Sequence, residues 1–258
     1  MNNRSAHWFR PSARSTAGFL CIGLFAALAL TVTTASVVSD FDTSLSAAIQ
    51  AARTPVLDRL MLAFTLLGDG GSLIWIAVAT VLALLIQRAW LKAGLAAAAF
   101  IGTSALVSLV KGLVGRARPT ADLYSGVDAF SFPSGHMTNA AIILGVAAFV
   151  LALGCTSARR RFIYGVAVLL IVMVGLSRVY LSAHWPSDVL GGALLATAIL
   201  LFLQPVLTSG EGSNAGWNKL ALLATCLAIW TGHAMLSYSN NSERYGLMTA
   251  AVERGYTK

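Results

Sequence analysis

The stretch FPSGHMTNAAIILGVAAFVLALGC, residues 132–155, joins a short polar turn to a long apolar run. The run from Met137 to Cys155 contains no charged residue, and about 20 mostly apolar residues are enough for a helix to cross a bilayer. Ser134, Gly135 and His136 stand immediately before this run, so we expect Ser134 to cap the N-terminus of the helix. The stretch therefore predicts a membrane-spanning helix with polar residues at its entry.

Six further apolar runs lie before and after this stretch, each bounded by charged or turn residues. They are Gly18–Val38, Ser72–Gln87, Lys92–Val110, Phe162–Leu181, Val189–Leu207 and Leu220–Tyr238. The seven runs predict an all-α protein, a polytopic transmembrane helical bundle with six core spans and a seventh, C-terminal span. No repeat or proline-rich linker divides the chain, so we expect one integral-membrane domain over residues 1–258, with residues 208–258 as a C-terminal extension.

The segment from Phe41 to Leu67 is apolar-rich but also carries polar positions. Its apolar residues recur at mixed three- and four-residue spacing, which is typical of a helix with one apolar face. Such a helix lies in the membrane interface, and a proline interrupts it. We therefore expect an interfacial helix that is broken near Pro55 and ends at a glycine-rich turn, in which Asp69 is a turn residue.

The composition excludes a water-soluble globule. Apolar residues make up 57% of the chain and charged residues 11%, whereas soluble domains carry about 25% charged residues. The chain is too apolar to be disordered. Its net charge of +8 does not indicate nucleic-acid binding, because the charges fall in short clusters between apolar runs, as they do in polytopic membrane proteins.

Basic residues predict which side of the membrane each connection faces, since Lys and Arg gather in cytoplasmic loops. Those that flank the spans are Arg4, Arg10, Arg14, Arg88, Lys92, Arg159, Arg160, Arg161 and Lys219. A chain whose N-terminus is inside puts all of them on the cytoplasmic side and leaves residues 39–71, 111–136 and 178–188 on the other side. The first run also has features of a signal peptide. We favour a retained span because the run is long, and the later topology is the same either way.

Three cations on the outer side do not follow this flanking rule. Lys111 and Arg118 lie at the outer end of one predicted span, and Arg178 lies at the outer end of another. Arginine offers forked donors that match phosphate oxygens, so we expect the three to bind an anion together. The start of a helix at Ser134 and Gly135 adds outward-facing backbone N–H groups, which form a second phosphate cradle.

Two histidines and a carboxylate in the same clusters suit phosphoryl transfer. His184 can attack phosphorus and form a phosphohistidine. Asp188 falls near the third position of the following helix, from where it can accept a hydrogen bond from one ring nitrogen of His184 and leave the other free. His136 can protonate the departing oxygen and later activate water. We expect neither a metal ion nor another cofactor in this scheme.

The three clusters resemble the K-x6-R-P, P-S-G-H and S-R-x5-H-x3-D signature of the type 2 phosphatidic acid phosphatase superfamily, which also contains the vanadium haloperoxidases. The positions filled are Lys111, Arg118, Pro119, Pro133, Ser134, Gly135, His136, Ser177, Arg178, His184 and Asp188. The resemblance covers residues 111–188 and implies His184 as nucleophile, His136 as general acid and Asp188 as the orienting carboxylate. The phosphate ligands that it implies are Lys111, Arg118, Ser134, Gly135 and Arg178.

These observations predict a membrane phosphatase that hydrolyses a lipid phosphate or diphosphate. The resemblance suggests undecaprenyl diphosphate, phosphatidic acid or phosphatidylglycerophosphate, and we favour the first because short loops and an interfacial helix suit a site at headgroup level. The expected location is the bacterial inner membrane, with the site on the periplasmic face. The alternatives are a lipid phosphotransferase that uses the same site and a non-enzymatic scaffold or transport protein. We expect the bilayer and a phosphorylated lipid as partners, and no nucleic acid.

Two further ionisable residues have no place in this scheme. Arg116 falls on no signature position, so we expect it to be solvated or to contact lipid headgroups. His233 is isolated in the last apolar run. We expect it to be a packed or interfacial histidine, and the sequence offers no partner for it.

Overall fold

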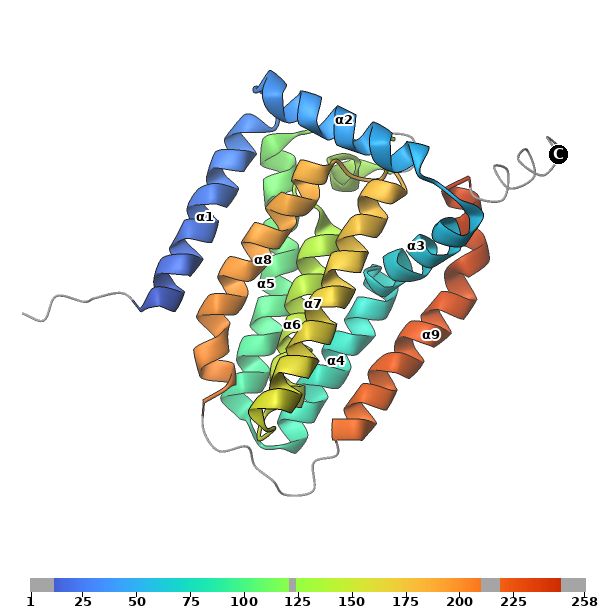
Figure 1. Cartoon of the computed structure of the whole chain (residues 1–258). Helices are drawn as coiled ribbons and strands as arrows, with labels where there is room; N and C mark the ends of the chain where they lie inside the picture. The colour runs from blue at the N-terminus through green and yellow to red at the C-terminus, as the bar shows by residue number, and fades with distance from the viewer. Residues whose placement is uncertain (1–11, 121–123, 210–218, 247–258) are drawn as a thin grey trace, which may run out of the picture.

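The computed structural model describes residues 12–120, 124–209 and 219–246, and these residues form helices and connections without any β-strand (Figure 1). The helices are α1 (Ala13–Thr31), α2 (Ser36–Ala51), α3 (Pro55–Leu67), α4 (Gly70–Ile86), α5 (Trp90–Val114), α6 (Gly135–Ala152), α7 (Ser157–Tyr180), α8 (Pro186–Leu207) and α9 (Lys219–Arg244), with a short 3₁₀ helix η2 (Gly126–Ala129). The prediction of an all-α bundle is confirmed.

Six of these helices, α1 and α5 to α9, are each long and apolar enough to cross a membrane. The pair α3 and α4 passes the same test only together, with a bend of 47° between the two helices, as in a broken span or a re-entrant loop. The described residues thus hold six candidate spans, or the expected seven if the bent pair counts as one, and the predicted span over Ser72–Gln87 does not pass the test by itself. That stretch forms most of α4, and the apolar helix α3 directly precedes it, separated by the break at Gly68 and Asp69.

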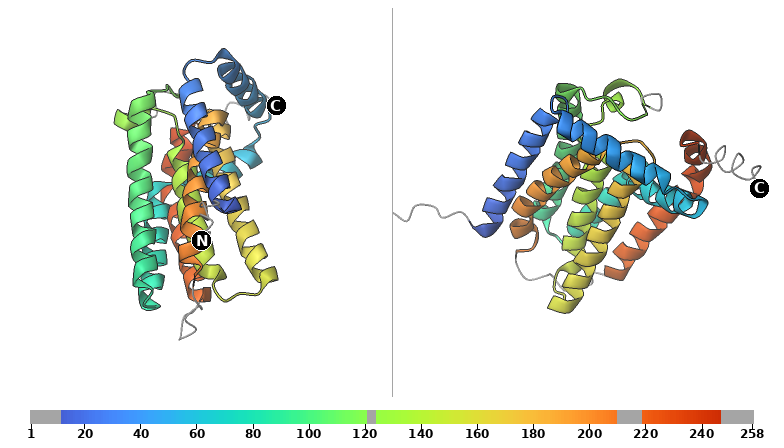
Figure 2. Two further views of the ribbon diagram at one scale, coloured as in Figure 1. Left: turned by 90° about the vertical axis from the view of Figure 1, so that its left-hand side faces the viewer. Right: turned by 45° about the horizontal axis from the view of Figure 1, so that its top comes forward.

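The segment predicted as one interfacial helix, broken near Pro55, forms two helices that run in different directions. Helix α2 crosses the end of the bundle at a steep angle to the other helices (Figures 1 and 2). Thr54 caps a new helix and Pro55 occupies its first turn, which is the position that proline favours. Helix α3 then turns into the bundle, where Leu62 and Leu66 are buried and the helix packs against α7 and α9.

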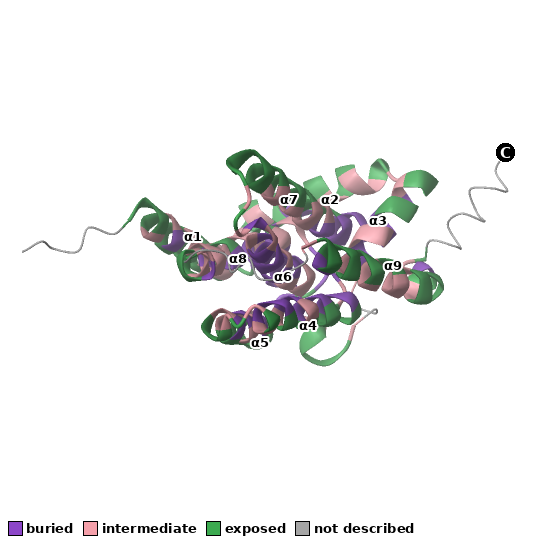
Figure 3. Cartoon of the chain, turned by 90° about the horizontal axis from the view of Figure 1, so that it is seen from below, coloured by how far each residue is buried: buried purple, intermediate pink, exposed green. Residues whose placement is uncertain are grey.

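Helix α6 forms the centre of the bundle. Its residues are apolar around the whole circumference and most are buried, as expected for a helix enclosed by others. Seen from below, it is surrounded by α4, α5, α7 and α8 (Figure 3). The stretch quoted at the outset therefore supplies the core of the fold as well as the polar entry of the central helix.

The start of α8 lies directly against the start of α6. A Cβ atom added at Gly192 would lie 3.0 Å from the carbonyl oxygen of Ser134 and 2.8 Å from the Thr138 hydroxyl oxygen, so only glycine permits this approach. The ends of α5 and α7 reach the same end of the bundle, beneath α2 (Figure 1). The three polar clusters of the sequence consequently meet at one end, as the alternation of spans predicts.

Candidate active site

His184 and Asp188 form a buried pair at the entry of α8. Pro186 opens the helix, and Asp188 Oδ2 accepts a hydrogen bond from the backbone N–H of Trp185 at 2.9 Å. The same oxygen lies 3.4 Å from His184 Nδ1. Both side chains are almost completely buried. The entry of α8 thus places the Asp188 carboxylate next to one ring nitrogen of His184, as the spacing H-x3-D predicts.

The other nitrogen of His184 faces a cation. Arg118 Nη1 lies 2.9 Å from His184 Nε2, and because a guanidinium only donates, Nε2 must accept. The ring proton is therefore assigned to Nδ1, which faces Asp188. Burial, followed by the positive charges of Arg118, Arg178 and Lys111, holds the pKa of His184 well below its ordinary value. The imidazole is neutral and carries its lone pair on the nitrogen that faces the cations.

Arg178 is a fully buried cation at the end of α7. Its guanidinium donates to the hydroxyl oxygens of Thr65 at 2.5 Å, Tyr124 at 2.6 Å and Tyr245 at 2.8 Å. Its Nε atom is buried and has no hydrogen-bond partner among the described residues. The arginine is held in place by neutral oxygens that do not cancel its charge.

Lys111 and the start of α6 complete the cluster. Lys111 Nζ is buried and lies 2.6 Å from Asp128 Oδ1 of η2. Ser134 caps α6 as predicted, with its Oγ 3.5 Å from the backbone nitrogen of Met137. A Cβ atom added at Gly135 would lie 4.0 Å from Lys111 Nζ. The structure therefore brings the expected phosphate ligands to one place.

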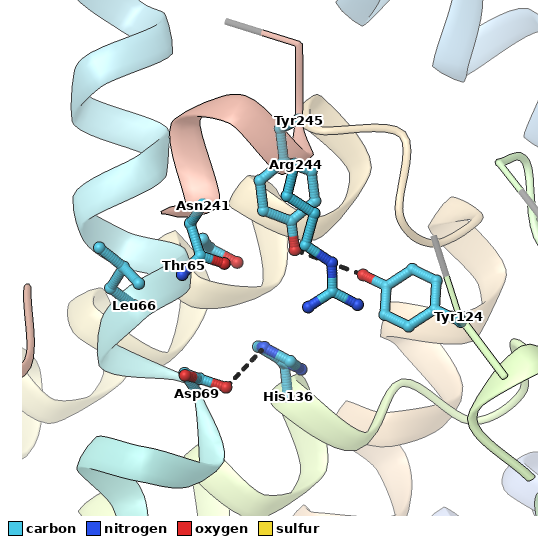
Figure 4. Close-up of a pocket in the computed structure, with 8 residues that line it drawn as sticks. All are labelled: Thr65, Leu66, Asp69, Tyr124, His136, Asn241, Arg244 and Tyr245. Atoms are coloured by element: carbon cyan, nitrogen blue, oxygen red, sulfur yellow. Dashed lines mark hydrogen bonds and ion pairs between the residues drawn. The ribbon is translucent and has the colours of Figure 1, made fainter. Parts of the chain in front are cut away.

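A small pocket lies beside His136 (Figure 4). It is lined by Thr65, Leu66, Asp69, Tyr124, His136, Asn241, Arg244 and Tyr245. These residues come from α3, the break before α4, the loop after α5, α6 and the end of α9. The C-terminal extension, to which the sequence assigned no task, thus contributes three residues to the pocket next to the predicted general acid.

The expectation for Arg116 was wrong, because this side chain is buried. Its Nη1 donates to Asp188 Oδ1 at 2.7 Å, and its Nη2 donates to Asp42 Oδ2 at 2.6 Å. The sequence places Arg116 two positions before Arg118, and in extended chain residues two apart point to the same side. The structure shows that this segment is extended, because Ala117 forms an antiparallel bridge with Phe130. Arg116 and Arg118 therefore face the site together. Asp42 comes from α2, and no local pattern connects it to the site.

Asp69 and His233, which were expected to be a turn residue and a packed or interfacial histidine, contact each other. Asp69 caps α4, with Oδ1 accepting from the Gly70 N–H at 2.9 Å. Its Oδ2 lies 2.8 Å from His233 Nε2, and its Oδ1 lies 4.0 Å from His136 Nε2. The histidine that lacked a predicted partner therefore pairs with the carboxylate nearest to the predicted general acid.

Metal ligation is not indicated within the described part of the chain, where no group of three or more His, Cys, Asp and Glu residues is arranged to hold a metal ion. The site holds several cationic side chains: Arg118 contacts His184, and Lys111 lies close to Gly135 at the start of α6. Positively charged, partly desolvated donors of this kind suit a phosphate group with several anionic oxygens.

The chain is similar in sequence to known proteins. A family model described as the PAP2 superfamily matches residues 92–208. Phosphatidylglycerophosphatase B of Bacillus subtilis (strain 168) is 36% identical over 169 residues, which are 64% of this chain and 81% of the relative. The undecaprenyl-diphosphatase of Sulfolobus acidocaldarius is 37% identical over 81 residues, which are 31% of this chain and 35% of that protein.

A solved structure agrees with the sequence matches. The crystal structure of the first transmembrane PAP2 type phosphatidylglycerolphosphate phosphatase from Bacillus subtilis superposes with a TM-score of 0.66 at 30% identity and covers 75% of this chain and 95% of its own. The resemblance inferred from the three motifs is thereby confirmed. The chain is an integral membrane protein and a phosphoester hydrolase that belongs to the PAP2 superfamily.

Proposed function

We propose that the protein hydrolyses the phosphate ester of a membrane lipid through a phosphohistidine on His184. The observation that carries this proposal is the placement of His184. Its Nδ1 faces Asp188 at 3.4 Å and its Nε2 faces Arg118 at 2.9 Å, inside a cluster of buried cations. A neutral, oriented imidazole next to an anion site is the arrangement that in-line attack on phosphorus requires.

The first step transfers the phosphoryl group to the enzyme. Arg118 exchanges its hydrogen bond to His184 for one to a phosphate oxygen, and Nε2 attacks phosphorus. The bond from phosphorus to the lipid oxygen breaks as His136 donates its proton to that oxygen, because a lipid alkoxide leaves poorly without one. Asp188 stabilises the positive charge that develops on the His184 ring.

The second step releases phosphate. Neutral His136 takes a proton from a water molecule, whose oxygen attacks phosphorus and breaks the bond to Nε2. Inorganic phosphate leaves, and both histidines return to their starting protonation states. Lys111, Arg118, Arg178 and the backbone N–H groups at the start of α6 stabilise the charge on the phosphoryl oxygens in both transition states.

The substrate that the relatives support first is phosphatidylglycerophosphate. The relative that aligns over 81% of its length and the superposed structure both carry this activity in their names. Undecaprenyl diphosphate, which the sequence analysis favoured, is supported by a relative that aligns over only 35% of its length. The site is proposed to face the periplasm, because Arg14, Arg88 and residues 159–161 lie at the ends of α1, α4 and α7 that are opposite the site.

The test is phosphate release by the protein purified in detergent. Phosphatidylglycerophosphate, undecaprenyl diphosphate and phosphatidic acid are offered separately, with and without a chelator, and free phosphate is measured. We expect release from at least one lipid, the fastest from phosphatidylglycerophosphate. A phosphate group that appears on a second lipid instead of in solution would identify a phosphotransferase. No consumption of any of the three lipids would contradict the proposal.

His184→Ala identifies the residue that carries the reaction. The variant should lose release by roughly 10³-fold or more, as nucleophile variants of other enzymes do. Asp40→Asn serves as the control, because Asp40 is an exposed acidic residue of α2 and should leave the rate unchanged. Full turnover by His184→Ala would exclude the phosphohistidine.

A further inference from the structure

Asp69 stands between two histidines that come from distant parts of the chain. Its Oδ2 lies 2.8 Å from Nε2 of His233 on α9, and its Oδ1 lies 4.0 Å from Nε2 of His136 on α6. Figure 4 shows the carboxylate and the His136 ring next to each other at one edge of the pocket, pointing toward one another. Ser237 contacts the remaining ring nitrogen of His233 at 3.5 Å. The carboxylate is therefore held from the α9 side and directed toward His136.

The break between α3 and α4 makes this approach possible. A Cβ atom added at Gly71 would lie 2.4 Å from Cε1 of His233, and one added at Gly68 would lie 2.4 Å from Val174 and 3.5 Å from the His136 ring. Contacts this short do not occur between real atoms, so a side chain at either position would push the helices apart. The glycines on both sides of Asp69 thus permit the close packing that brings the carboxylate to both rings.

The remaining charges around His136 are positive. Arg178, Arg118 and Lys111 face it from α7, the loop after α5 and the end of α5. The neutral ring of His184 faces it from the entry of α8. Arg244 of α9 lines the same pocket. A general acid must carry a proton in the presence of these cations, and a carboxylate within about 4–6 Å stabilises a protonated imidazole. Asp69 is the acidic residue among the side chains that line the pocket.

We infer that Asp69 is a positioning residue for the general acid: it orients the His136 ring and stabilises its protonated form, while His233 of α9 holds Asp69 in place. This inference rests on the proposed function, because it gives His136 the proton that the lipid oxygen receives. Asp69 and His233 both lie outside residues 92–208, which the family model matches. The inference also gives the C-terminal helix a task in the reaction.

The dependence of the rate on the leaving group separates this role from a structural one. A general acid matters most for an alkoxide and little for a nitrophenolate, which leaves without a proton. We compare phosphates that share one alkyl chain and differ in the leaving oxygen, from an alkyl alcohol to a nitrophenol. The ratio kcat/KM reports the attack step alone, because the later hydrolysis of the phosphohistidine is the same for every substrate. Asp69→Asn should lower kcat/KM for the alkyl phosphate by about 10–100-fold, less than the roughly 10²–10⁴-fold that a general acid contributes, because His136 itself remains. It should lower kcat/KM for the nitrophenyl phosphate by less than about threefold.

Further variants test whether the effect passes through His136. His136→Ala should show the same leaving-group pattern in the attack step, and adding Asp69→Asn to it should cause no further loss. His233→Gln should give a weaker form of the pattern, and Asp69→Glu should restore part of the activity on the alkyl phosphate. Asp40→Asn is the matched control for the loss of an acidic side chain, since Asp40 lies on the exposed surface of α2.

The outcomes keep the two proposals apart. If the unaltered protein releases phosphate neither from these compounds nor from the lipids, the proposed function itself fails. If it does release phosphate but Asp69→Asn lowers the rate for both leaving groups equally, the residue has only a structural role. Full activity of Asp69→Asn on the alkyl phosphate, or additive losses in the double variant, would also overturn the inference.

Discussion

Arg116 donates a hydrogen bond of 2.7 Å to Asp188, on Oδ1, the carboxylate oxygen that does not face His184. The two oxygens of one carboxylate thus serve different partners. One oxygen orients the predicted nucleophile, and the other is fixed by a buried arginine. That arginine is in turn held by Asp42 at 2.6 Å. A chain of charged contacts therefore runs from α2 to the catalytic pair.

Replacing Arg116 by lysine should lower turnover while the protein remains folded. Lysine keeps the charge but cannot form two forked hydrogen bonds to separate carboxylates, so Asp188 would be held less firmly. We expect kcat to fall by about 10–100-fold, as when outer partners of catalytic ligands are removed, with little change in KM. Arg59→Lys, an exposed arginine of α3, is the control. An unchanged kcat in Arg116→Lys would show that Asp188 needs no such support.

Arg116→Ala should act mainly on stability. It leaves the carboxylates of Asp42 and Asp188 buried without their common cation. Breaking a buried ion pair in this way typically costs about 3–5 kcal/mol. We expect a clear drop in the thermal unfolding midpoint in detergent, and Asp42→Asn added to Arg116→Ala should recover part of it. No recovery in the double variant would contradict the pairing of these two residues.

The His184 ring should remain neutral as the pH falls through about 6.5, the ordinary value for histidine. Burial and the charges of Arg118, Arg178 and Lys111 hold its pKa well below that value, and a lowered pKa means that the neutral form persists to lower pH. Nitrogen NMR of protein labelled at its 4 histidines, with His184→Gln for assignment, measures this directly. Protonation of His184 near pH 6.5 would contradict the described surroundings. Arg118→Gln should move its titration upward.

Vanadate should inhibit by taking the five-coordinate geometry of the attacked phosphorus. We expect it to bind at His184 and the cation cluster, and to raise the thermal unfolding midpoint of the unaltered protein. Arg178→Gln removes a buried guanidinium that reaches the site from α7 and should weaken inhibition by at least about tenfold, in keeping with the loss of a charge-assisted contact. Equal inhibition of the variant and the unaltered protein would argue against Arg178 as a phosphate ligand.

Local patterns predicted those parts of the site that depend on neighbours in the chain. Ser134 caps α6, and Asp188 reaches back over the entry of α8, because capping is decided within a few residues. Alternation of the spans was enough to bring Lys111, Arg178 and His184 to one end of the bundle. These predictions depended on spacing along one chain segment and on the direction of each helix, both of which can be read from the sequence.

Contacts between distant segments could not be predicted in the same way. Asp42 and Arg116 are separated by 74 positions and His233 and Asp69 by 164, and no periodicity relates either pair. Helix α3 was placed at the interface because its polar residues resemble those of a surface helix. In the structure Asp58 of α3 accepts a hydrogen bond from the Tyr180 hydroxyl at 2.7 Å, so a partner on α7 allows the polar side chain to be buried.

The contacts of Asp42 have a consequence for how this family can diverge. Asp42 accepts hydrogen bonds from the Ser187 backbone nitrogen and hydroxyl as well as from Arg116, so one residue of α2 satisfies three donors near the reaction centre. A lineage that loses the acidic residue at this position would leave the buried guanidinium of Arg116 with Asp188 as its remaining carboxylate partner. Positions 42 and 116 should therefore change together across homologues, and α2 should be retained as an inherited unit wherever both are present.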